Sequence, residues 1–303
     1  GKTSLAIECL VPALQAVIQG TKLPEHVDSI EAKGIQSVKV IDSKPIGANV
    51  RSTVATYDGV FDDLRKLFAR TADAKAKGLT AGDFSYNTGK LRCPVCDGTG
   101  IITMDVQFLP DVDTICPSCG GSRYGKDAYD ILWKSKEKDS VSVSLPGLLK
   151  LTVEEAAGIL HEETKIAKQL KILQDLGVCY LMLGEATPAL SGGEAQRLKL
   201  AYETETPQQG SVFVFDEPTI GLHPQDVKKL VLIFDHLIQL GATVIVIEHD
   251  LELVTNCDYI IDMGPWGGTE GGRVVVEGTP EAVAATSESI TGRYLKQELA
   301  EDK

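Results

Sequence analysis

The chain has 303 residues, of which 43% are hydrophobic and 24% are charged, so it can bury a large core in one big domain or two modest ones. Its formal net charge of −13 argues against a surface that coats polyanions in general, although local basic stretches can still meet phosphates. We find no apolar run typical of a membrane span and no secretory-leader pattern, and therefore expect the protein in the cytoplasm.

The first residues form the sequence GKTS and precede an apolar segment. They match the end of a Gly-x-x-x-x-Gly-Lys-Ser/Thr loop, in which the lysine reaches the β- and γ-phosphates and the hydroxyl binds Mg²⁺. We therefore expect a nucleotide to contact Gly1, Lys2, Thr3 and Ser4, and expect the chain to be part of a longer protein that supplies the start of the loop. The helix that follows should end or kink near Pro12.

A short amphipathic helix is predicted next, because Phe61, Leu64, Leu67 and Phe68 recur at helical spacing. It precedes a glycine-rich approach to the cysteine-containing part of the chain.

Four cysteines form two Cys-x-x-Cys pairs, Cys93 with Cys96 and Cys116 with Cys119. Each pair turns both sulfurs toward one point, so two pairs can close a tetrahedral thiolate site for structural Zn²⁺. The alternative is two unrelated redox pairs. The spacing therefore predicts a zinc-binding module over residues 89–126.

Residues 101–115 lie between the cysteine pairs, and their alternating apolar residues predict a hairpin. The hairpin carries Asp105, Asp111 and Asp113, which make its tip a poor phosphate clamp. If the module touches nucleic acid, its base, which carries basic residues, is a better surface for phosphate contacts than the acidic tip. That base comprises Lys90, Arg92, Arg123 and Lys126. The alternative role is a scaffold for a neighbouring domain.

From about residue 150 to 189 the pattern is helical, and the segment LSGGEAQRLKLA follows it. Ser191 and the backbone amides of Gly192 and Gly193 can face an anionic phosphate at a helix start. The same residues also fit an ordinary capped helix, in which Glu194 completes a capping box with Ser191.

Residues 211–217 are an apolar run that ends in Asp216 and Glu217, as expected of a buried parallel strand that delivers acids to the phosphate-binding edge of a sheet. Asp216 would hold Mg²⁺, and Glu217 would orient or deprotonate the attacking water. A helix is predicted after this strand, from Pro224 to the glycine at position 241.

A further buried strand, residues 243–249, ends at Glu248 and His249. The histidine could contact a γ-phosphate, and a structural role is the alternative. Residues 259–263 and 273–277 are predicted as the strands that finish the sheet.

In this order, the motifs resemble an ABC-type ATPase domain. The segments FLPDVDTICPSCGGSRY, LSGGEAQRLKLA, FDEPTIGLHPQD and VIEHDLELV closely resemble the C-terminal nucleotide-binding half of the UvrA family. PIGANVRSTVATYDGVFDDLRKLFA also resembles it, so the similarity covers essentially the whole chain. The resemblance implies an α/β fold: a P-loop NTPase sheet core of the ABC type, with a helical signature subdomain and an inserted zinc-binding module.

The resemblance also implies a division of the chain. Residues 1–88 would be the first part of the ATPase core, with a truncated P-loop and the Q-loop region. Residues 89–126 would be the zinc module and residues 127–189 the helical signature subdomain. Residues 190–303 would carry the signature motif, the Walker B strand and the switch histidine.

Each site residue takes a role from the resemblance. Lys2 and Thr3 match the end of the phosphate-binding loop, and Asp216 matches the carboxylate that binds Mg²⁺. Glu217 matches the catalytic base, and His249 matches the switch histidine. Ser191, Gly192 and Gly193 match the turn that closes over ATP held by a different nucleotide-binding domain. One half therefore supplies two half-sites, and weak ATPase activity is expected of it alone.

The resemblance implies ATP, Mg²⁺ and Zn²⁺ as cofactors. It implies damaged double-stranded DNA as a partner, with ATP controlling DNA engagement in nucleotide-excision repair. The N-terminal ATPase half, a second copy of the full-length protein and a UvrB-like repair protein are the other expected partners.

The sequence departs from the family at Ser43, in VIDSKPIG, where a glutamine usually helps to hold Mg²⁺ and water. The serine side chain is too short to hold Mg²⁺ and water in the same way. The stretch GANVRSTVATY retains Arg51 as its one cation, where the family is richer in Arg and Pro. These departures leave a UvrA paralogue that serves drug tolerance as an alternative.

Two other classes of protein share part of this sequence pattern. An ABC ATPase that energises transport shares every ATP residue but gives no reason for the cysteine module. A DnaJ-type zinc chaperone module resembles CPVCDGTG but carries four such repeats, whereas this chain has two.

Overall fold

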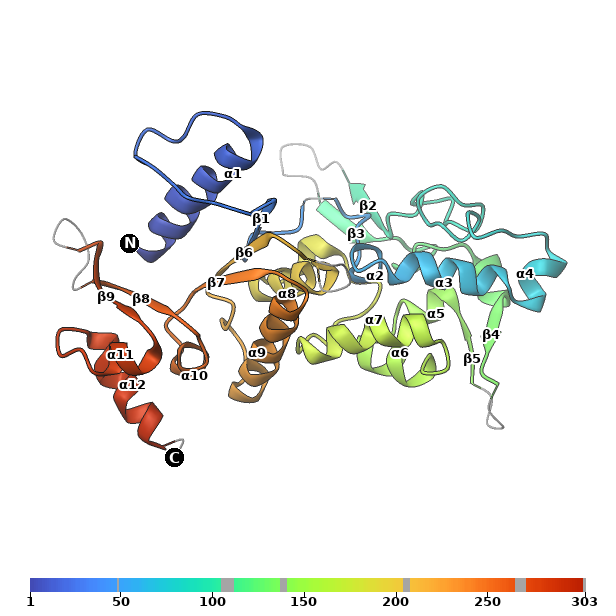
Figure 1. Cartoon of the computed structure of the whole chain (residues 1–303). Helices are drawn as coiled ribbons and strands as arrows, with labels where there is room; N and C mark the ends of the chain where they lie inside the picture. The colour runs from blue at the N-terminus through green and yellow to red at the C-terminus, as the bar shows by residue number, and fades with distance from the viewer. Residues whose placement is uncertain (48, 105–111, 137–140, 204–207, 265–270, 302–303) are drawn as a thin grey trace. The chain divides into compact units, whose positions relative to one another are not determined.

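The computed structural model describes the chain except for residues 48, 105–111, 137–140, 204–207, 265–270 and 302–303. The chain divides into two compact units (Figure 1). The first unit comprises residues 1–44 and 203–303, and the second comprises residues 45–202. The four-part division implied by the resemblance stays a prediction. In the described part of the chain, no helix is long and apolar enough to cross a membrane.

A parallel sheet in the order β1-β6-β7 forms the core of the first unit. Its strands are β1 (Ser37–Ile41), β6 (Ser211–Asp216) and β7 (Thr243–Ile247). Ile41 lies opposite Phe215, and Asp216 lies opposite Ile247, so the three strands end at one common edge. The residues that follow the strands therefore meet at this edge, where α/β sheets bind their ligands.

Helices cover both faces of this sheet, because successive side chains of a strand point to opposite sides. Val212 and Val214 of β6 pack against η1 (Ser4–Leu10) and α1 (Val11–Gln19). Phe215 points to the other face, where its ring lies 4.6 Å from that of Phe234 of α9 (Pro224–Gln239).

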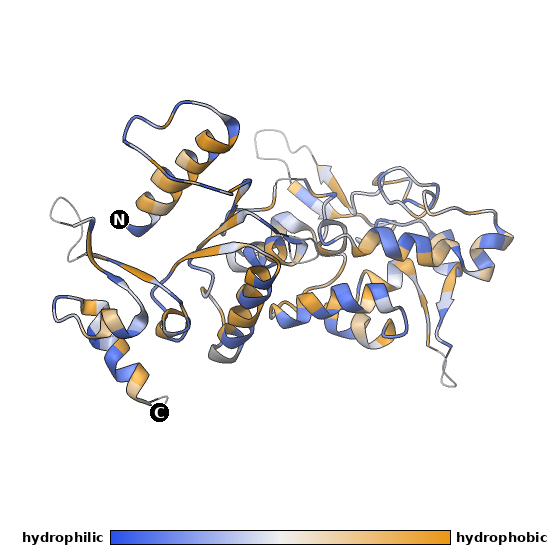
Figure 2. Ribbon diagram, viewed as in Figure 1, coloured by the Kyte–Doolittle hydropathy of each residue, from blue (hydrophilic) through white to orange (hydrophobic). Residues whose placement is uncertain are grey.

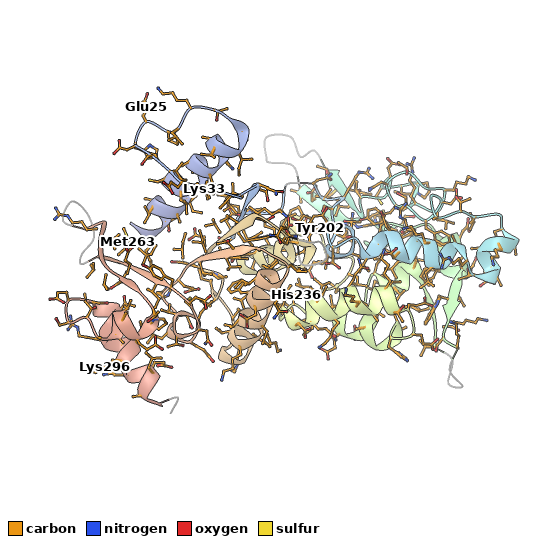
Figure 3. All side chains as sticks on the ribbon, viewed as in Figure 1. Glu25, Lys33, Tyr202, His236, Met263 and Lys296 are labelled. Atoms are coloured by element: carbon orange, nitrogen blue, oxygen red, sulfur yellow. The ribbon has the colours of Figure 1, made fainter. Side chains whose placement is uncertain are left out.

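The helix α9 confirms the prediction for this segment. Bands of apolar and polar residues alternate along it (Figure 2). Its apolar residues Val227, Leu230 and Leu237 are buried, whereas His236 of the same helix, labelled in Figure 3, is exposed. Gly241 follows the helix with a φ of +93°, as the prediction of a glycine past its end requires.

The prediction that the first helix ends or kinks near Pro12 is wrong in one respect, because the helix continues to Gln19. The residues before Pro12 form the π-helical segment η1, and the α-helix begins at Val11. Pro12 lacks an N–H, and the carbonyl of Glu8, four residues earlier, contacts His26 Nε2 at 3.0 Å. The helix thus loses one internal hydrogen bond at Pro12 and continues without ending.

The prediction that the last two strands finish the sheet is also wrong. β8 (Ile260–Gly264) and β9 (Arg273–Gly278) pair with each other as a separate antiparallel sheet. Their apolar residues pack instead against a small cluster of three helices. These helices are α10 (Leu251–Thr255), α11 (Pro280–Ala284) and α12 (Ile290–Glu301).

The second unit combines short helices with two hairpins. Its elements are α2 (Val54–Tyr57), α3 (Val60–Ala69), α4 (Ala72–Ala76), β2 (Ile101–Met104), β3 (Val112–Ile115), η2 (Lys126–Asp130), β4 (Leu132–Lys134), β5 (Ser142–Ser144), α5 (Leu145–Leu148), α6 (Val153–Ile159), α7 (Thr164–Asp175), η3 (Thr187–Ala189) and α8 (Gly192–Glu203). The amphipathic helix predicted before the cysteines is α3, and the hairpin predicted between the cysteine pairs is β2–β3. Asp105 and Asp111 of the predicted acidic tip lie outside the described residues.

Tyr86 lies at the centre of the second unit's core and is fully buried. Its ring lies 4.8 Å from that of Phe61 and 6.1 Å from that of Tyr124. Its hydroxyl donates to the Arg51 carbonyl at 2.9 Å. This core joins α3 to the segment that precedes the cysteine module, because Tyr86 reaches both.

We predict that Phe215→Ala destabilises the first unit by about 3–5 kcal/mol, because a fully buried aromatic side chain leaves a cavity between the sheet and α9. Leu232→Ala on the exposed side of α9 is the control and should change stability by less than about 0.5 kcal/mol. Urea unfolding followed by fluorescence and circular dichroism measures both. Equal midpoints for the two variants would contradict the packing described.

Candidate functional site

The common edge of the parallel sheet gathers most of the residues predicted to bind a nucleotide. Asp216 ends β6 and Glu217 follows it, His249 follows β7 by two residues, and Lys2 and Thr3 stand at the start of the first helix. All of them belong to the first unit. Residues far apart in the sequence therefore lie in one place.

Lys2 and Thr3 contact the ends of two strands. The Lys2 ammonium donates to the Glu248 carbonyl at 3.0 Å, and the Thr3 hydroxyl donates to Asp216 Oδ1 at 3.5 Å. Gly1 and Ser4 flank them at the helix start. A hydroxyl beside a carboxylate at a strand end is a set of oxygen ligands that suits Mg²⁺.

Asp216 and Glu217 are adjacent acids in different environments. Burial raises the pKa of Asp216, and the negative charge of Glu217 raises it further. Glu217 has a φ of +48°, a left-handed conformation that is costly for a residue other than glycine. Such strain is typical of functional positions. A cation bound at Asp216 would offset the cost of ionising this carboxyl group.

His249 lies close to both neighbouring acids. Its Nδ1 atom is 4.0 Å from Glu217 Oε1 and 3.6 Å from Glu248 Oε2. The side chain is 68% exposed, so a ligand at the sheet edge can reach it. This placement is compatible with the predicted switch role.

The Glu248 side chain, to which no sequence pattern assigned a role, is 2% exposed. It accepts hydrogen bonds from the backbone N–H groups of Thr219, His249 and Asp250, at 3.0, 2.6 and 3.0 Å, and from the Thr219 hydroxyl. Burial opposes ionisation, but these hydrogen bonds outweigh it and lower the pKa of Glu248. The carboxylate thereby joins the loops after β6 and β7. The position of Glu248 at the end of a predicted strand was the sequence feature that could have indicated this role.

Ser43 follows β1 by two residues and is exposed. Its hydroxyl makes no hydrogen bond with the described residues. It therefore stands near the sheet edge by its position in the chain, without a contact that fixes it.

Ser191, Gly192 and Gly193 belong to the second unit, where they begin α8. The Ser191 N–H donates to Glu194 Oε2 at 2.7 Å, and the Glu194 N–H donates to Ser191 Oγ at 3.4 Å. The capping box considered as the alternative is thus present. It leaves the serine hydroxyl proton available, so it does not conflict with phosphate binding.

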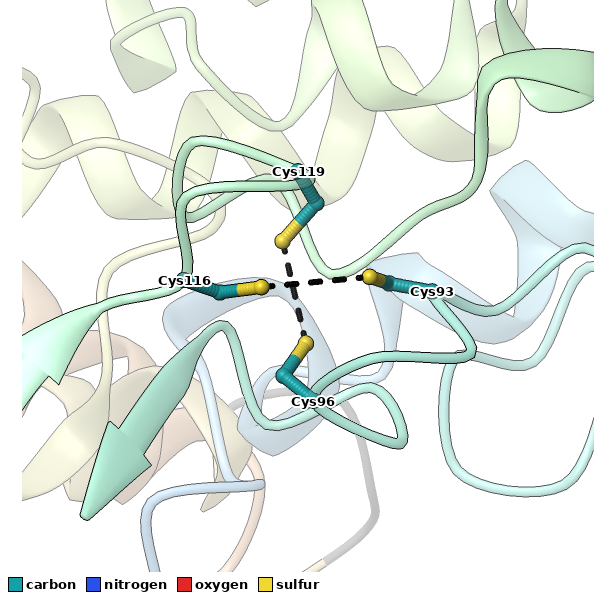
Figure 4. A group of neighbouring side chains, drawn as sticks. All are labelled: Cys93, Cys96, Cys116 and Cys119. Carbon is teal, nitrogen blue, oxygen red and sulfur yellow. Dashed lines mark hydrogen bonds between the residues drawn. The ribbon is translucent and has the colours of Figure 1, made fainter. Parts of the chain in front are cut away.

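The four paired cysteines converge in the second unit (Figure 4). Their sulfur atoms all lie within 4.8 Å of one another, with Cys93 and Cys116 at 4.0 Å and Cys96 and Cys119 at 3.7 Å. These distances are too long for a disulfide. A tetrahedral site with Zn–S bonds of about 2.3 Å has sulfurs about 3.8 Å apart, which the cluster fits.

The cluster also has the electrostatics of a site for a cation. Burial raises the pKa of Cys119 to about 12, and the neighbouring thiols contribute. Burial acts the same way on Cys93, but hydrogen bonds from the backbone of Cys96 and Val95 outweigh it and lower its pKa to about 7. A divalent cation would stabilise four thiolates that otherwise repel one another.

The proposed basic base of the module is not one exposed patch. Arg123 is buried and lies over the Tyr86 ring, with its guanidinium carbon 5.1 Å from the ring centroid. Lys90 is paired with Asp83 at 3.4 Å, and Arg92 with Asp97 at 2.9 Å. Lys126 is exposed. The prediction that Arg123 belongs to this surface is therefore wrong, because its side chain is buried against Tyr86.

We predict that Gly98→Ala prevents the cysteine cluster from holding one Zn²⁺ per chain. Gly98 has a φ of +79°, and a Cβ there would lie 1.7 Å from the Tyr86 carbonyl oxygen. The matched control is Gly120→Ala, which has a φ of +57° and no atom within 4 Å of its Cβ, and should cost only about 1–2 kcal/mol. Zinc content after dialysis, measured with a metal indicator upon thiol modification, separates the two. Full zinc content in Gly98→Ala would be inconsistent with this backbone approach.

Comparisons with known proteins extend along the whole chain, although no protein-family model matches it. UvrABC system protein A of Staphylococcus aureus (strain COL) is 43% identical over 306 residues, which is 100% of this chain and 32% of that protein. UvrABC system protein A of Clostridium acetobutylicum is 45% identical over 99% of this chain and 31% of that protein.

A solved structure agrees. The crystal structure of UvrA2 from Deinococcus radiodurans has a TM-score of 0.81 and 40% sequence identity, over 99% of this chain and 35% of that chain. The expected fold class, an α/β ABC-type sheet core with a cysteine module inserted, is thereby confirmed. The chain spans about a third of the length of the curated relatives it matches. Over that span, this chain belongs to the UvrA family.

Proposed function

We propose that this chain works as the C-terminal ATPase half of a longer UvrA-type protein, which binds damaged double-stranded DNA in nucleotide-excision repair and uses ATP to control DNA engagement. The convergence of Lys2, Thr3, Asp216 and Glu217 on one edge of a parallel sheet carries the proposal. The relatives favour this function over drug resistance or transport, because they carry the name UvrABC system protein A.

The residues at the sheet edge fit Mg²⁺ and a nucleotide. Thr3 and Asp216 would hold the metal through oxygen atoms, and the metal, when bound, would neutralise negative charge on the phosphates. Lys2 has three donors, so it can keep its bond to the Glu248 carbonyl while it donates to a phosphate oxygen.

Glu217 would act as the general base for the attacking water. Its side chain is 41% exposed and follows the proposed Mg²⁺ ligand directly. Its N–H donates to the Ile247 carbonyl at 2.9 Å, which fixes the strained backbone at the sheet edge. His249 lies close enough to contact the same water or the terminal phosphate. Glu248 keeps the two loops together while this happens.

The signature residues would serve a different ATP molecule. Ser191, Gly192 and Gly193 would close over ATP held by another nucleotide-binding domain, supplied by the N-terminal ATPase half or by a second copy of the full-length protein. Since neither half-site has its complement within this chain, we infer weak hydrolysis by the chain alone. A UvrB-like repair partner and a cytoplasmic location belong to the same proposal.

The cysteine cluster would hold a structural Zn²⁺. The four sulfurs would fix the fold of residues 89–126 and leave no open position for chemistry. The cluster would present the hairpin β2–β3 as a stable projection, because a bound Zn²⁺ would tie both ends of the hairpin together. A link between nucleotide state and DNA through this module belongs to the same proposal.

We predict that Glu217→Gln, in the longer protein, retains ATP binding but slows turnover by at least ~100-fold, because the carboxamide cannot accept the proton from water. Glu252→Gln is the matched control, since Glu252 lies in α10 and pairs with Lys228 at 3.3 Å. Steady-state phosphate release and equilibrium binding of a fluorescent ATP analogue measure the two properties. Near-normal turnover in Glu217→Gln would remove Glu217 from this role.

A further inference from the structure

A polar network surrounds the start of α8 in the second unit. The Glu194 carboxylate uses both oxygens: Oε2 accepts the Ser191 N–H at 2.7 Å, and Oε1 accepts the Tyr180 hydroxyl at 2.7 Å. The capping box explains only the first of these bonds. The second comes from a residue outside the helix, and nothing in the proposed function uses it.

The backbone around Tyr180 is firmly held. The carbonyls of Cys179 and Leu181 accept the N–H groups of Glu154 and Val153 at the start of α6, at 3.0 and 2.9 Å. The side chain of Leu181 is buried. Tyr180 itself is 54% exposed, so its ring is held by a fixed backbone and not by the core. The hydroxyl therefore reaches Glu194 from a rigid support.

The surroundings of Tyr180 and Glu194 determine which of the two groups carries the shared proton. Burial raises the pKa of Tyr180, and the hydrogen bond to Glu194 raises it further. Burial opposes ionisation of Glu194, but the hydrogen bonds from Tyr180 and Ser191 and the charge of Arg197 outweigh it and lower its pKa. Tyr180 thus keeps its proton as the donor, and Glu194 stays ionised as the acceptor.

Ser191 Oγ accepts the Glu194 N–H, which leaves the serine hydroxyl proton free to donate to a phosphate oxygen. A Glu194 carboxylate released from Tyr180 could rotate toward Ser191 and accept that proton itself. It would also place a negative charge nearer to an incoming phosphate, which repels it. The position of one carboxylate therefore decides whether the serine is available.

We propose that Tyr180 is a positioning residue for the signature serine: its hydroxyl holds the Glu194 carboxylate in the helix cap and so keeps the Ser191 hydroxyl available to a phosphate. This inference rests on the proposed function, because it requires Ser191 to contact ATP held by another nucleotide-binding domain. The Arg197 side chain lies beside both Tyr180 and Glu194, so the proposed action of Tyr180 is through Glu194, and the double-mutant cycle below isolates that part.

The test is a double-mutant cycle in the longer protein, read as KM and kcat for ATP. Tyr180→Phe keeps the ring and should raise KM about tenfold with kcat little changed, since binding is lost equally in the ground and transition states. In a Glu194→Gln background, which keeps the cap without the charge, the same change should alter KM less than about twofold. Tyr294→Phe, a similarly exposed tyrosine of α12, is the control and should have no effect.

Three outcomes are distinguishable. A KM increase that is equal in both backgrounds would mean that Tyr180 acts by packing and would overturn the inference. An unchanged KM in Tyr180→Phe, when Ser191→Ala lowers turnover, would overturn it as well. An unchanged rate in Ser191→Ala would instead remove the signature motif from the proposed function. Urea midpoints of Tyr180→Phe and Tyr294→Phe should agree with that of the parent protein, because both hydroxyls belong to exposed side chains, whereas Ser191→Ala removes a helix cap and should cost about 0.5–2 kcal/mol.

Discussion

The Glu248 carboxylate joins the two loops from which the reactive side chains of the first unit project. It is almost completely buried, and it is satisfied by Thr219 on one loop and by His249 and Asp250 on the other. A hydrogen bond to a charged group contributes about 1.5–3 kcal/mol, so these bonds hold the loop after β6, which begins at Glu217, to the loop that carries His249. The same residue offers its backbone carbonyl to Lys2. Lys2, Glu217 and His249, the residues proposed to contact the phosphates and the attacking water, thus all lie next to Glu248 or its loops.

A comparable constraint organises the second unit. The cysteine cluster draws together two turns that are separated by a hairpin, and the backbone there approaches the core so closely that Gly98 admits no side chain. Arg51 extends the connection, because its guanidinium donates to the Asp97 carbonyl at 2.9 Å and its own carbonyl accepts the Tyr86 hydroxyl. A metal bound by the cysteines would therefore stabilise the core around Tyr86 as well as the turns themselves.

Features that depend on local periodicity could be predicted from the sequence. The helices α3 and α9 follow from apolar residues at helical spacing, and β6 follows from an apolar run that ends in two acids. The cysteine cluster follows from paired spacing alone. Features that depend on distant contacts could not. Local alternation predicts that β8 and β9 are strands, but the choice of partner is made by packing against α10, α11 and α12.

The candidate site also contains features that could be predicted from the sequence and features that could not. The charged residues at strand ends are visible in the sequence, whereas the hydrogen bonds from Thr219 to Glu248 and from Tyr180 to Glu194 join residues 29 and 14 positions apart. The burial of Arg123 was equally hidden, because an arginine beside a glycine-rich turn is typical of a surface. The first helix continues past Pro12 after a π-helical segment, which no residue pattern predicted.

The most direct measurement is fluorescence anisotropy of the longer zinc-loaded protein, with ATP, on lesion-bearing and undamaged duplexes at one fixed salt concentration. We expect tighter binding to the lesion, and a smaller difference between the two duplexes when Glu217→Gln slows turnover. Equal binding to both duplexes, or none, would contradict a role in damage recognition and would assign this ATPase to another task.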